Sequence, residues 1–158
     1  MRPYELNDRE RLVEFYSNLS DEVLRWSLPP YGRQRIETWL SNPGQHVILL
    51  AQHEGKIIGH LQIVGNSSPR MVGIGELIVY LHQDFLNVGL GTTMVKRSLE
   101  FARAQGFHRI GLTVVAENRK AIHVYEKAGF KREGNRSESY RGADGRYYDA
   151  AEMGIVLS

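Results

Sequence analysis

The sequence predicts an α/β fold in which helices flank a mixed, mostly antiparallel central sheet. Two observations support this prediction. Short segments rich in β-branched and aromatic residues alternate with segments whose apolar residues recur at helical spacing. The glycine-bearing segment Gly89–Thr92 also separates a strand-like run, Glu76–Leu81, from an amphipathic helical run. The expected order is βααβββαβαββ, in which a β–α–β link gives a parallel contact between neighbouring strands.

The first half of the chain is expected to form a short strand, two helices and a hairpin. Arg2–Leu6 is a plausible strand, and Asp8 can cap a helix whose apolar residues share one face. That face carries Leu12, Phe15, Tyr16 and Leu19. A second helix carries Ile36, Trp39 and Leu40 and is stopped by Asn42-Pro43-Gly44. Two strands, Val47–Gln52 and Ile57–Val64, meet at a turn over Glu54-Gly55.

The second half shows the clearest boundaries, because glycines stand where helices should end. Gly106 follows the helix expected from Leu90 to Gln105, and Gly129 follows the helix expected from Asn118 to Ala128. The strands expected here are Glu76–Leu81, Arg109–Val115, Lys131–Tyr140 and Tyr147–Leu157, the last two joined by a hairpin turn over Gly142–Gly145.

Composition indicates one globular domain covering residues 1–158, with 42% apolar and 24% charged residues. The chain has no cysteine, so disulfides, thiolate metal sites and acyl transfer through an enzyme thiol are excluded. No apolar run is long enough to span a membrane, and the first residues do not resemble a signal peptide, so we expect a cytoplasmic protein. A net charge of +2 is too small to indicate nucleic-acid binding.

The turn Gly89-Leu90-Gly91-Thr92 has the chemistry of a phosphate site. A glycine-bearing turn that opens a helix leaves backbone N–H groups unpaired, and the helix dipole adds positive potential there. A dinucleotide motif is a weak alternative, since Met94 stands where its third glycine would be. A P-loop is unlikely because Gly-Lys-Ser/Thr occurs nowhere in the chain. These glycines alone leave two interpretations open, a cofactor site and a tightly packed turn without a ligand.

The residues after this turn change that balance. Gln83–Gly91 is followed by a helix, a strand and a motif that reads Val114-x-x-x-Asn118-x-x-Ala121-Ile122-x-x-Tyr125-Glu126-Lys127-x-Gly129-Phe130. This region, from Val72 to Leu157, resembles the acyl-CoA-binding half of the GNAT N-acyltransferase superfamily, nearest to the small-amine and amino-acid (phosphinothricin-type) acetyltransferases. The chain departs from the family at Leu86, where Gln or Arg is usual, but the backbone donors of the loop need no side chain.

The resemblance implies acetyl-CoA as cosubstrate and a GNAT-like fold. It implies that the backbone of Leu81 pairs with the pantetheine arm and helps polarise the thioester carbonyl. Asn118 would bind the pantetheine or phosphate region. The pyrophosphate would be held by the backbone N–H groups of Val88, Gly89, Leu90, Gly91, Thr92 and Thr93.

Two residues are the expected catalytic groups. Tyr125 matches the tyrosine that family members use as general acid toward the departing thiolate; with an ordinary pKa of ~10, a tyrosine is protonated at neutral pH. Glu76 is the candidate proton acceptor for the attacking amine, directly or through water, in a partly apolar cleft that would raise its pKa. The alternative is a solvated or amine-binding Glu76 that transfers no proton. His82 is the alternative base, and no histidine spacing matches a zinc signature, so no metal is expected.

The acceptor pocket is expected from Asp21–Leu40 and from the last hairpin. Trp26, Tyr31 and Trp39 could form its walls, although Trp39 is more readily explained as helix core. Asp144-Gly145-x-x-x-Asp149 resembles a hairpin of small-amine and amino-acid acetyltransferases, which favours a small primary amine. Protein or peptide acetylation, at N-termini or lysines, and a non-catalytic acyl-CoA-binding module are the alternatives. A homodimer is possible, because dimers are common among similar enzymes.

Overall fold

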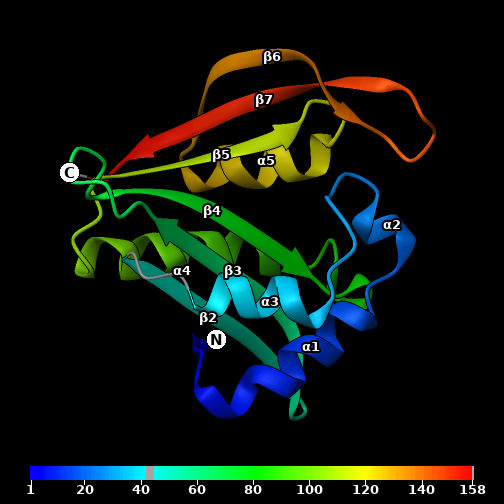
Figure 1. Cartoon of the computed structure of the whole chain (residues 1–158), viewed down its shortest axis with the longest axis vertical. Coiled ribbons are helices and arrows are strands. Elements are labelled where there is room, and N and C mark those ends of the chain that lie inside the picture. The colour runs from blue at the N-terminus through cyan, green and yellow to red at the C-terminus, as the bar shows by residue number, and fades with distance from the viewer. Residues whose placement is uncertain (42–44, 158) are drawn as a thin grey trace.

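The computed structural model describes residues 1–41 and 45–157, and within them one seven-stranded sheet forms the centre of the molecule (Figure 1). The strand order is β1-β2-β3-β4-β5-β7-β6. Every pair of neighbouring strands is antiparallel except β4 and β5, which are parallel. The predicted fold class is therefore confirmed.

The elements follow the predicted order closely. The strands are β1 Arg2–Pro3, β2 His46–His53, β3 Lys56–Gly65, β4 Ile74–Leu81, β5 Arg109–Val115, β6 Lys131–Arg141 and β7 Tyr147–Val156. The α-helices are α1 Arg9–Ser17, α2 Asp21–Leu24, α3 Arg33–Leu40, α4 Leu90–Ala104 and α5 Arg119–Ala128.

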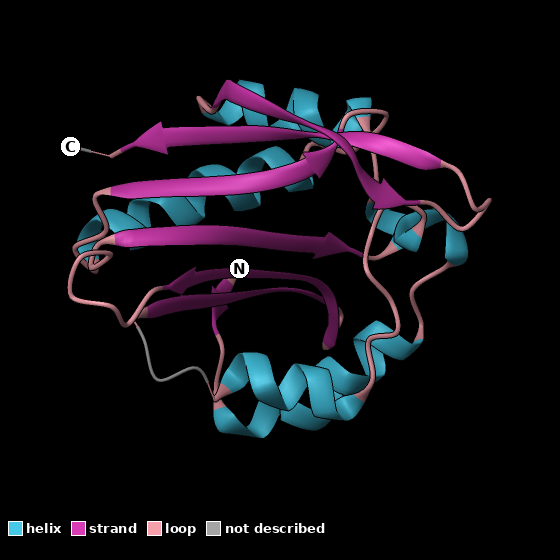
Figure 2. Ribbon diagram, turned by 45° about the horizontal axis from the view of Figure 1, so that its top comes forward, coloured by secondary structure: helices cyan, strands magenta, loops and turns pink. Residues whose placement is uncertain are grey.

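Helices cover both faces of the sheet (Figure 2). Helices α4 and α5 cover one face, and the core there includes Met94, Val95 and Leu99 of α4, which are at most 3% exposed. Helices α1 and α3 cover the other face with Leu12 and Ile36, both fully buried. Because side chains alternate along a strand, β2 contributes to both cores. No helix in the described part of the chain is long and apolar enough to cross a membrane.

Strands β4 and β5 are paired only where they begin. Ile74, Gly75 and Glu76 lie opposite Arg109, Ile110 and Gly111, and no later residues of the two strands are paired. The five remaining residues of β4 and the four of β5 therefore diverge toward their carboxyl ends. This fork opens the middle of an otherwise continuous sheet.

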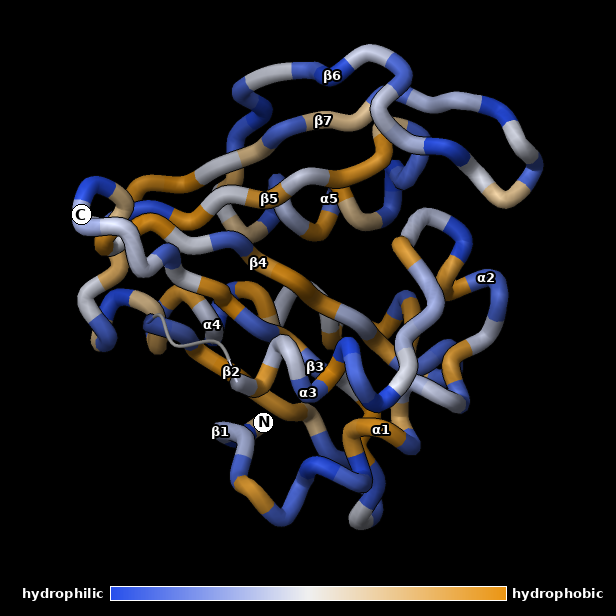
Figure 3. The backbone as a smooth tube through the Cα atoms, in the orientation of Figure 1, coloured by the Kyte–Doolittle hydropathy of each residue, from blue (hydrophilic) through white to orange (hydrophobic). Residues whose placement is uncertain are grey.

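The outermost strand, β6, is mostly exposed and polar, as the pale and blue tube of Figure 3 shows. It pairs only with β7, and its register shifts between Arg136 and Tyr140. The β6–β7 hairpin extends past the sheet toward α2 (Figure 1). The turn end of this hairpin lies against the segment after α2, where the Tyr140 hydroxyl bonds the carbonyls of Arg25 and Ser27, whereas the end of the chain lies beside the start of β5.

Three details of the first half differ from the sequence-based prediction. The first strand covers only Arg2–Pro3 and not Arg2–Leu6, because a 3₁₀ turn begins at Leu6. A short helix, α2, forms where none was expected; Ser20 begins it, and its Oγ accepts a hydrogen bond from the N–H of Val23 at 3.3 Å. Asp8 precedes α1, but its side chain does not cap that helix. The predicted helix stop at Asn42-Pro43-Gly44 lies outside the described residues.

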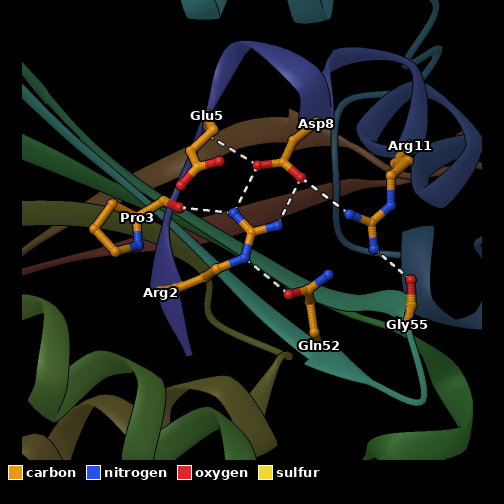
Figure 4. Close-up of polar contacts among 7 residues, drawn as sticks. All are labelled: Arg2, Pro3, Glu5, Asp8, Arg11, Gln52 and Gly55. Carbon is orange, nitrogen blue, oxygen red and sulfur yellow. Dashed lines mark hydrogen bonds and ion pairs between the residues drawn. The ribbon is translucent and has the colours of Figure 1, made fainter.

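The carboxylate of Asp8 instead binds Arg2 of β1 and so holds the segment before α1 against the edge of the sheet (Figure 4). The guanidinium of Arg2 donates to both of its oxygens at 2.7 Å, and the backbone N–H of Glu5 donates at 2.9 Å. Arg2 also donates to the Gln52 side chain on β2 at 2.8 Å. The segment before α1 turns back on itself because Leu6–Asp8 is a 3₁₀ turn, and this points the carboxylate toward Arg2.

Candidate active site

A cleft of about 670 Å³ lies at the fork between β4 and β5. Its lining comes from the end of β4, the turn before α4, the start and one face of α5, and the segment that includes α2. These elements are distant in the sequence and meet because β4 and β5 diverge. Among the lining residues are Arg25, Trp26, Ser27, Tyr80, Leu81, Gly89, Gly91, Thr92, Asn118 and Tyr125.

The glycine turn has the geometry expected of an anion site. Gly89 is the N-cap of α4 with φ of 81°, a left-handed conformation that glycine adopts without strain. The N–H groups of Leu90, Gly91 and Thr92 have no partner within the helix and point toward its N-terminal end. The N–H of Thr93 donates to the carbonyl of Gly89 at 3.1 Å. Space at Gly91 is tight: a Cβ there would lie 3.3 Å from Cδ1 of Leu81, so that side chain would have to shift.

Five of the eight predicted cofactor residues line the cleft with their own atoms: Leu81, Gly89, Gly91, Thr92 and Asn118. Val88, Leu90 and Thr93 are not among the lining residues. The side chain of Val88 is 69% exposed, and the hydroxyl of Thr93 donates to the carbonyl of Gly89 at 3.1 Å. The backbone roles predicted for these three residues stay predictions.

Asn118 connects the end of β5 to the start of α5 through two hydrogen bonds. Its Oδ1 accepts a hydrogen bond from the N–H of Ala121 at 3.3 Å, which caps α5. Its own N–H donates to the carbonyl of Val115 at 2.9 Å. The side-chain amide nitrogen can still donate, so capping and ligand binding are compatible in one residue.

Tyr125 projects from α5 into the cleft wall and is half-buried. Its ring packs edge-on against Phe130, with ring centroids 6.0 Å apart. Burial raises the pKa of Tyr125 to about 12, because the phenolate would lose its hydration. The hydroxyl is therefore protonated at neutral pH and is available as a donor in the cleft.

A second tyrosine, Tyr80 on β4, lines the same cleft. Its hydroxyl is hydrogen-bonded to that of Tyr31, which in turn accepts the N–H of Leu28 at 2.9 Å. Burial raises the pKa of Tyr80 well above its ordinary value, so this group is also neutral. Sequence reasoning did not single out Tyr80, because an aromatic residue in a strand usually serves packing alone.

Glu76 lies at the base of the fork and is not among the residues that line the cleft. Its side chain is exposed and borders a separate hollow of about 260 Å³ with Val64, Asn66 and Met71. Glu76 is therefore an exposed carboxylate outside the cleft in which it was expected. Glu76 and Tyr80 do share one face of β4, since they are four residues apart in an extended strand.

Two of the histidines, His60 and His82, offer little as bases. His60 is fully buried, burial lowers its pKa to about 3, and its Nδ1 lies 2.6 Å from the hydroxyl of Tyr16. The Nδ1 atom of His82 accepts the N–H of Asp84 at 3.2 Å, and its Nε2 lies 3.2 Å from the Gln83 amide nitrogen. Neither residue lines the cleft, whereas His123 on α5 does.

Of the three predicted acceptor-wall residues, only Trp26 lines the cleft. Tyr31 and Trp39 lie behind it in an aromatic cluster with Tyr16, in which ring centroids are 5.3 to 5.7 Å apart. Trp39 therefore serves the core, as its helical spacing indicated. Tyr31 supports the wall indirectly, through its hydrogen bonds to Leu28 and Tyr80.

Sequence reasoning missed the basic residues of the cleft. The part of the cleft formed by α5 is lined by three basic side chains, Arg119, Lys120 and Lys127. They give that part of the cleft a positive character. The available signal was their place in the motif, Arg119 and Lys120 directly after Asn118 and Lys127 two residues after Tyr125. In the described residues, no three His, Asp or Glu side chains are grouped as a metal ion would require.

Comparisons with known proteins agree with this geometry. The model of the Acetyltransferase (GNAT) family matches residues 10–130. A spermidine N(1)-acetyltransferase of Vibrio cholerae is 31% identical over 61% of this chain, which spans 62% of that relative's length. An L-amino acid N-acetyltransferase of Escherichia coli is 31% identical over 68% of this chain and 67% of its own.

Solved structures extend the similarity over the whole chain. A GNAT-family acetyltransferase of Streptococcus pneumoniae aligns with a TM-score of 0.88 and 29% identity, covering 99% of this chain and 98% of its own. Chains of the same fold have been crystallised with CoA and spermine or with acetyl-CoA. The predicted family resemblance is thus confirmed.

Proposed function

Because the chain belongs to the GNAT acetyltransferase family, we propose that it transfers an acetyl group from acetyl-CoA directly to a primary amine, and that the acceptor is a small amine or an amino-acid-like molecule. One observation carries this proposal: the glycine turn, Leu81 and Tyr125 meet in a single cleft where the sheet is forked. The named activities of the Vibrio and Escherichia relatives support the acceptor class.

The chemistry would use three parts of the cleft. The N–H groups at the start of α4 would hold the pyrophosphate, assisted by the cations of α5. The backbone at Leu81, where β4 has left β5, would pair with the pantetheine and polarise the thioester carbonyl. Tyr125 would protonate the thiolate as it leaves.

The attacking amine must also lose a proton. Glu76 remains the predicted acceptor of that proton, and because its carboxylate does not line the cleft, a water molecule would carry the proton to it. A single acetyltransferase domain, a cytoplasmic location and a homodimer likewise stay predictions.

The decisive experiment is an acceptor screen. The purified protein is incubated with acetyl-CoA and a panel of polyamines, amino acids, aminated drugs, peptides and proteins, and free CoA is measured. We expect CoA release with at least one small primary amine. Turnover with peptides or proteins alone would overturn the acceptor class, and no turnover with any acceptor would overturn the activity.

The placement of Glu76 outside the cleft favours one second candidate, an acyl-CoA-binding module without chemistry. Titration calorimetry separates the two. Micromolar CoA binding without acyl transfer to any member of the panel would select the binding module.

A further inference from the structure

The irregular segment 25–28, between α2 and α3, forms one wall of the cleft through Arg25, Trp26 and Ser27. The N–H groups of Arg25 and Ser27 donate to carbonyls of α2 at 3.3 and 3.0 Å. The carbonyl oxygens of the segment need donors from elsewhere. The hydroxyl of Tyr140 on β6 lies 3.0 Å from the carbonyl oxygen of Arg25 and 2.8 Å from that of Ser27.

An irregularity in β6 brings Tyr140 to this position. Arg136 lies opposite Ala150 and Tyr140 opposite Tyr148, so three residues of β6 span the distance that one residue of β7 spans. Glu138 takes a left-handed conformation with φ of 48°, and its N–H donates to Oδ1 of Asp149 at 2.9 Å. Asp149 therefore holds the bulge that redirects the strand.

The turn of the same hairpin supports the segment through a second ring. Asp144 accepts the N–H of Arg146 at 3.0 Å and the hydroxyl of Tyr148. The ring of Tyr148 packs edge-on against Trp26, with centroids 5.1 Å apart. The two aspartates of the Asp-Gly-x-x-x-Asp sequence thus orient two tyrosines toward one short segment.

We infer that the β6–β7 hairpin holds residues 25–28 in place as a wall of the acceptor site, and we call this support the clasp. Tyr140 is then a positioning residue that sets acceptor affinity. This inference rests on the proposed function. The hairpin's aspartates lie in the clasp and act through Tyr140 and Tyr148. Without the Tyr140 hydroxyl, the carbonyls of Arg25 and Ser27 lose their donor and the wall gains freedom, whereas the glycine turn and α5 keep all their contacts.

The test compares Tyr140→Phe with Tyr147→Phe. The control removes a hydroxyl from the same hairpin, at a side chain that is 61% exposed. Steady-state kinetics with the best acceptor of the screen give KM and kcat, calorimetry gives CoA affinity, and hydrogen exchange with mass spectrometry reports on peptides that cover residues 25–28.

For Tyr140→Phe we expect the acceptor KM to rise about 2- to 10-fold, as the net loss of one hydrogen bond implies. The change in kcat should be smaller, CoA affinity should stay unchanged, and exchange should be faster in residues 25–28. Tyr147→Phe should match the wild type in all four.

Two results would overturn the inference while leaving the proposed function intact: an acceptor KM equal to that of the wild type, or a parallel loss of CoA affinity. If the wild type acetylates nothing, the proposed function fails on its own. In that case, unchanged hydrogen exchange in residues 25–28 of Tyr140→Phe would also reject the clasp. Faster exchange would show that the hairpin holds this segment in place.

Discussion

Glu76 of β4 lies opposite Gly111 of β5 at the last register position that the two strands share. Every residue of β4 that lines the cleft comes after this point. The proposed acid, Tyr125, lines the cleft beyond the fork, while the proposed proton acceptor stands at its base. The group proposed to take the proton of the amine and the group proposed to protonate the thiolate therefore lie apart. Each can be tested by a variant of its own.

Tyr125→Phe should lower kcat by ~10²–10⁴-fold, the range for general acid catalysis, with little change in CoA affinity. The hydroxyl acts on the departing sulfur and not on the bound ground state. Because burial raises the pKa of Tyr125 to about 12, loss of its proton should not reduce wild-type activity between pH 7 and pH 10. Steady-state kinetics over this range, with calorimetry of CoA binding, measure both effects. An unchanged kcat, with chemistry shown to be rate-limiting, would remove Tyr125 from the acid role.

Gly89→Ala should weaken CoA binding, because alanine at φ of 81° is strained and shifts the N–H groups that begin α4. Gly106→Ala is a matched control at the other end of the same helix, where φ is 83°. Both variants should lose similar stability, on the order of 1 kcal/mol. Calorimetry with CoA should show an affinity loss for Gly89→Ala alone, and equal affinities in the two variants would place the phosphates elsewhere.

Gly91→Val should prevent CoA binding through steric crowding and not through backbone strain. Its backbone is helical, but a Cβ would lie 3.3 Å from Leu81 and 3.7 Å from Val124, so a branched side chain fills the cleft between them. We expect loss of measurable CoA binding by a folded variant, checked by circular dichroism and calorimetry. Affinity equal to that of the wild type would contradict the assignment of the glycine turn to the cofactor.

Glu76→Gln tests the proton acceptor. The amide keeps the size of the side chain but cannot take a proton, so kcat/KM at pH 7 should fall. Activity should partly recover at high pH, where more of the acceptor is already the free amine. A rise in acceptor KM with an unchanged pH profile would indicate positioning instead. If neither parameter changes, both roles of Glu76 are excluded.

Asp8→Asn should lower the free energy of unfolding at neutral pH by about 1–3 kcal/mol, because the buried carboxylate binds Arg2 and the N–H of Glu5. The hydrogen bond from Arg2 is the main cause of the lowered pKa of Asp8. A carboxylate with a lowered pKa stabilises the fold above its unfolded pKa of ~3.9, and this contribution is lost as pH falls through the folded value.

The stability difference between wild type and Asp8→Asn should therefore be constant from pH 7 to about pH 5 and shrink below about pH 4. Urea unfolding at several pH values measures it, with Glu14→Gln on the exposed face of α1 as control. A difference that persists unchanged at pH 2 would show that the ion pair is not its origin.

Local sequence patterns determined where the helices and strands of this protein lie, and a local motif was enough to identify its family. Periodicity fixed α4, whose Met94, Val95 and Leu99 are buried as their spacing predicts. Gly106 and Gly129 ended their helices because both take left-handed conformations. The cofactor motif could be recognised because its residues are close in the chain and act largely through backbone groups.

Only the tertiary structure decided which side chains share the cleft. Glu76 and Tyr80 look alike in sequence, two polar residues of one strand, but the fork opens after Glu76 and leaves only Tyr80 at the cleft. Tyr140 reaches Arg25 across 115 residues of chain, through a bulge that no local pattern predicts. Register and strand divergence depend on contacts between distant segments, and a single sequence carries no direct record of those contacts.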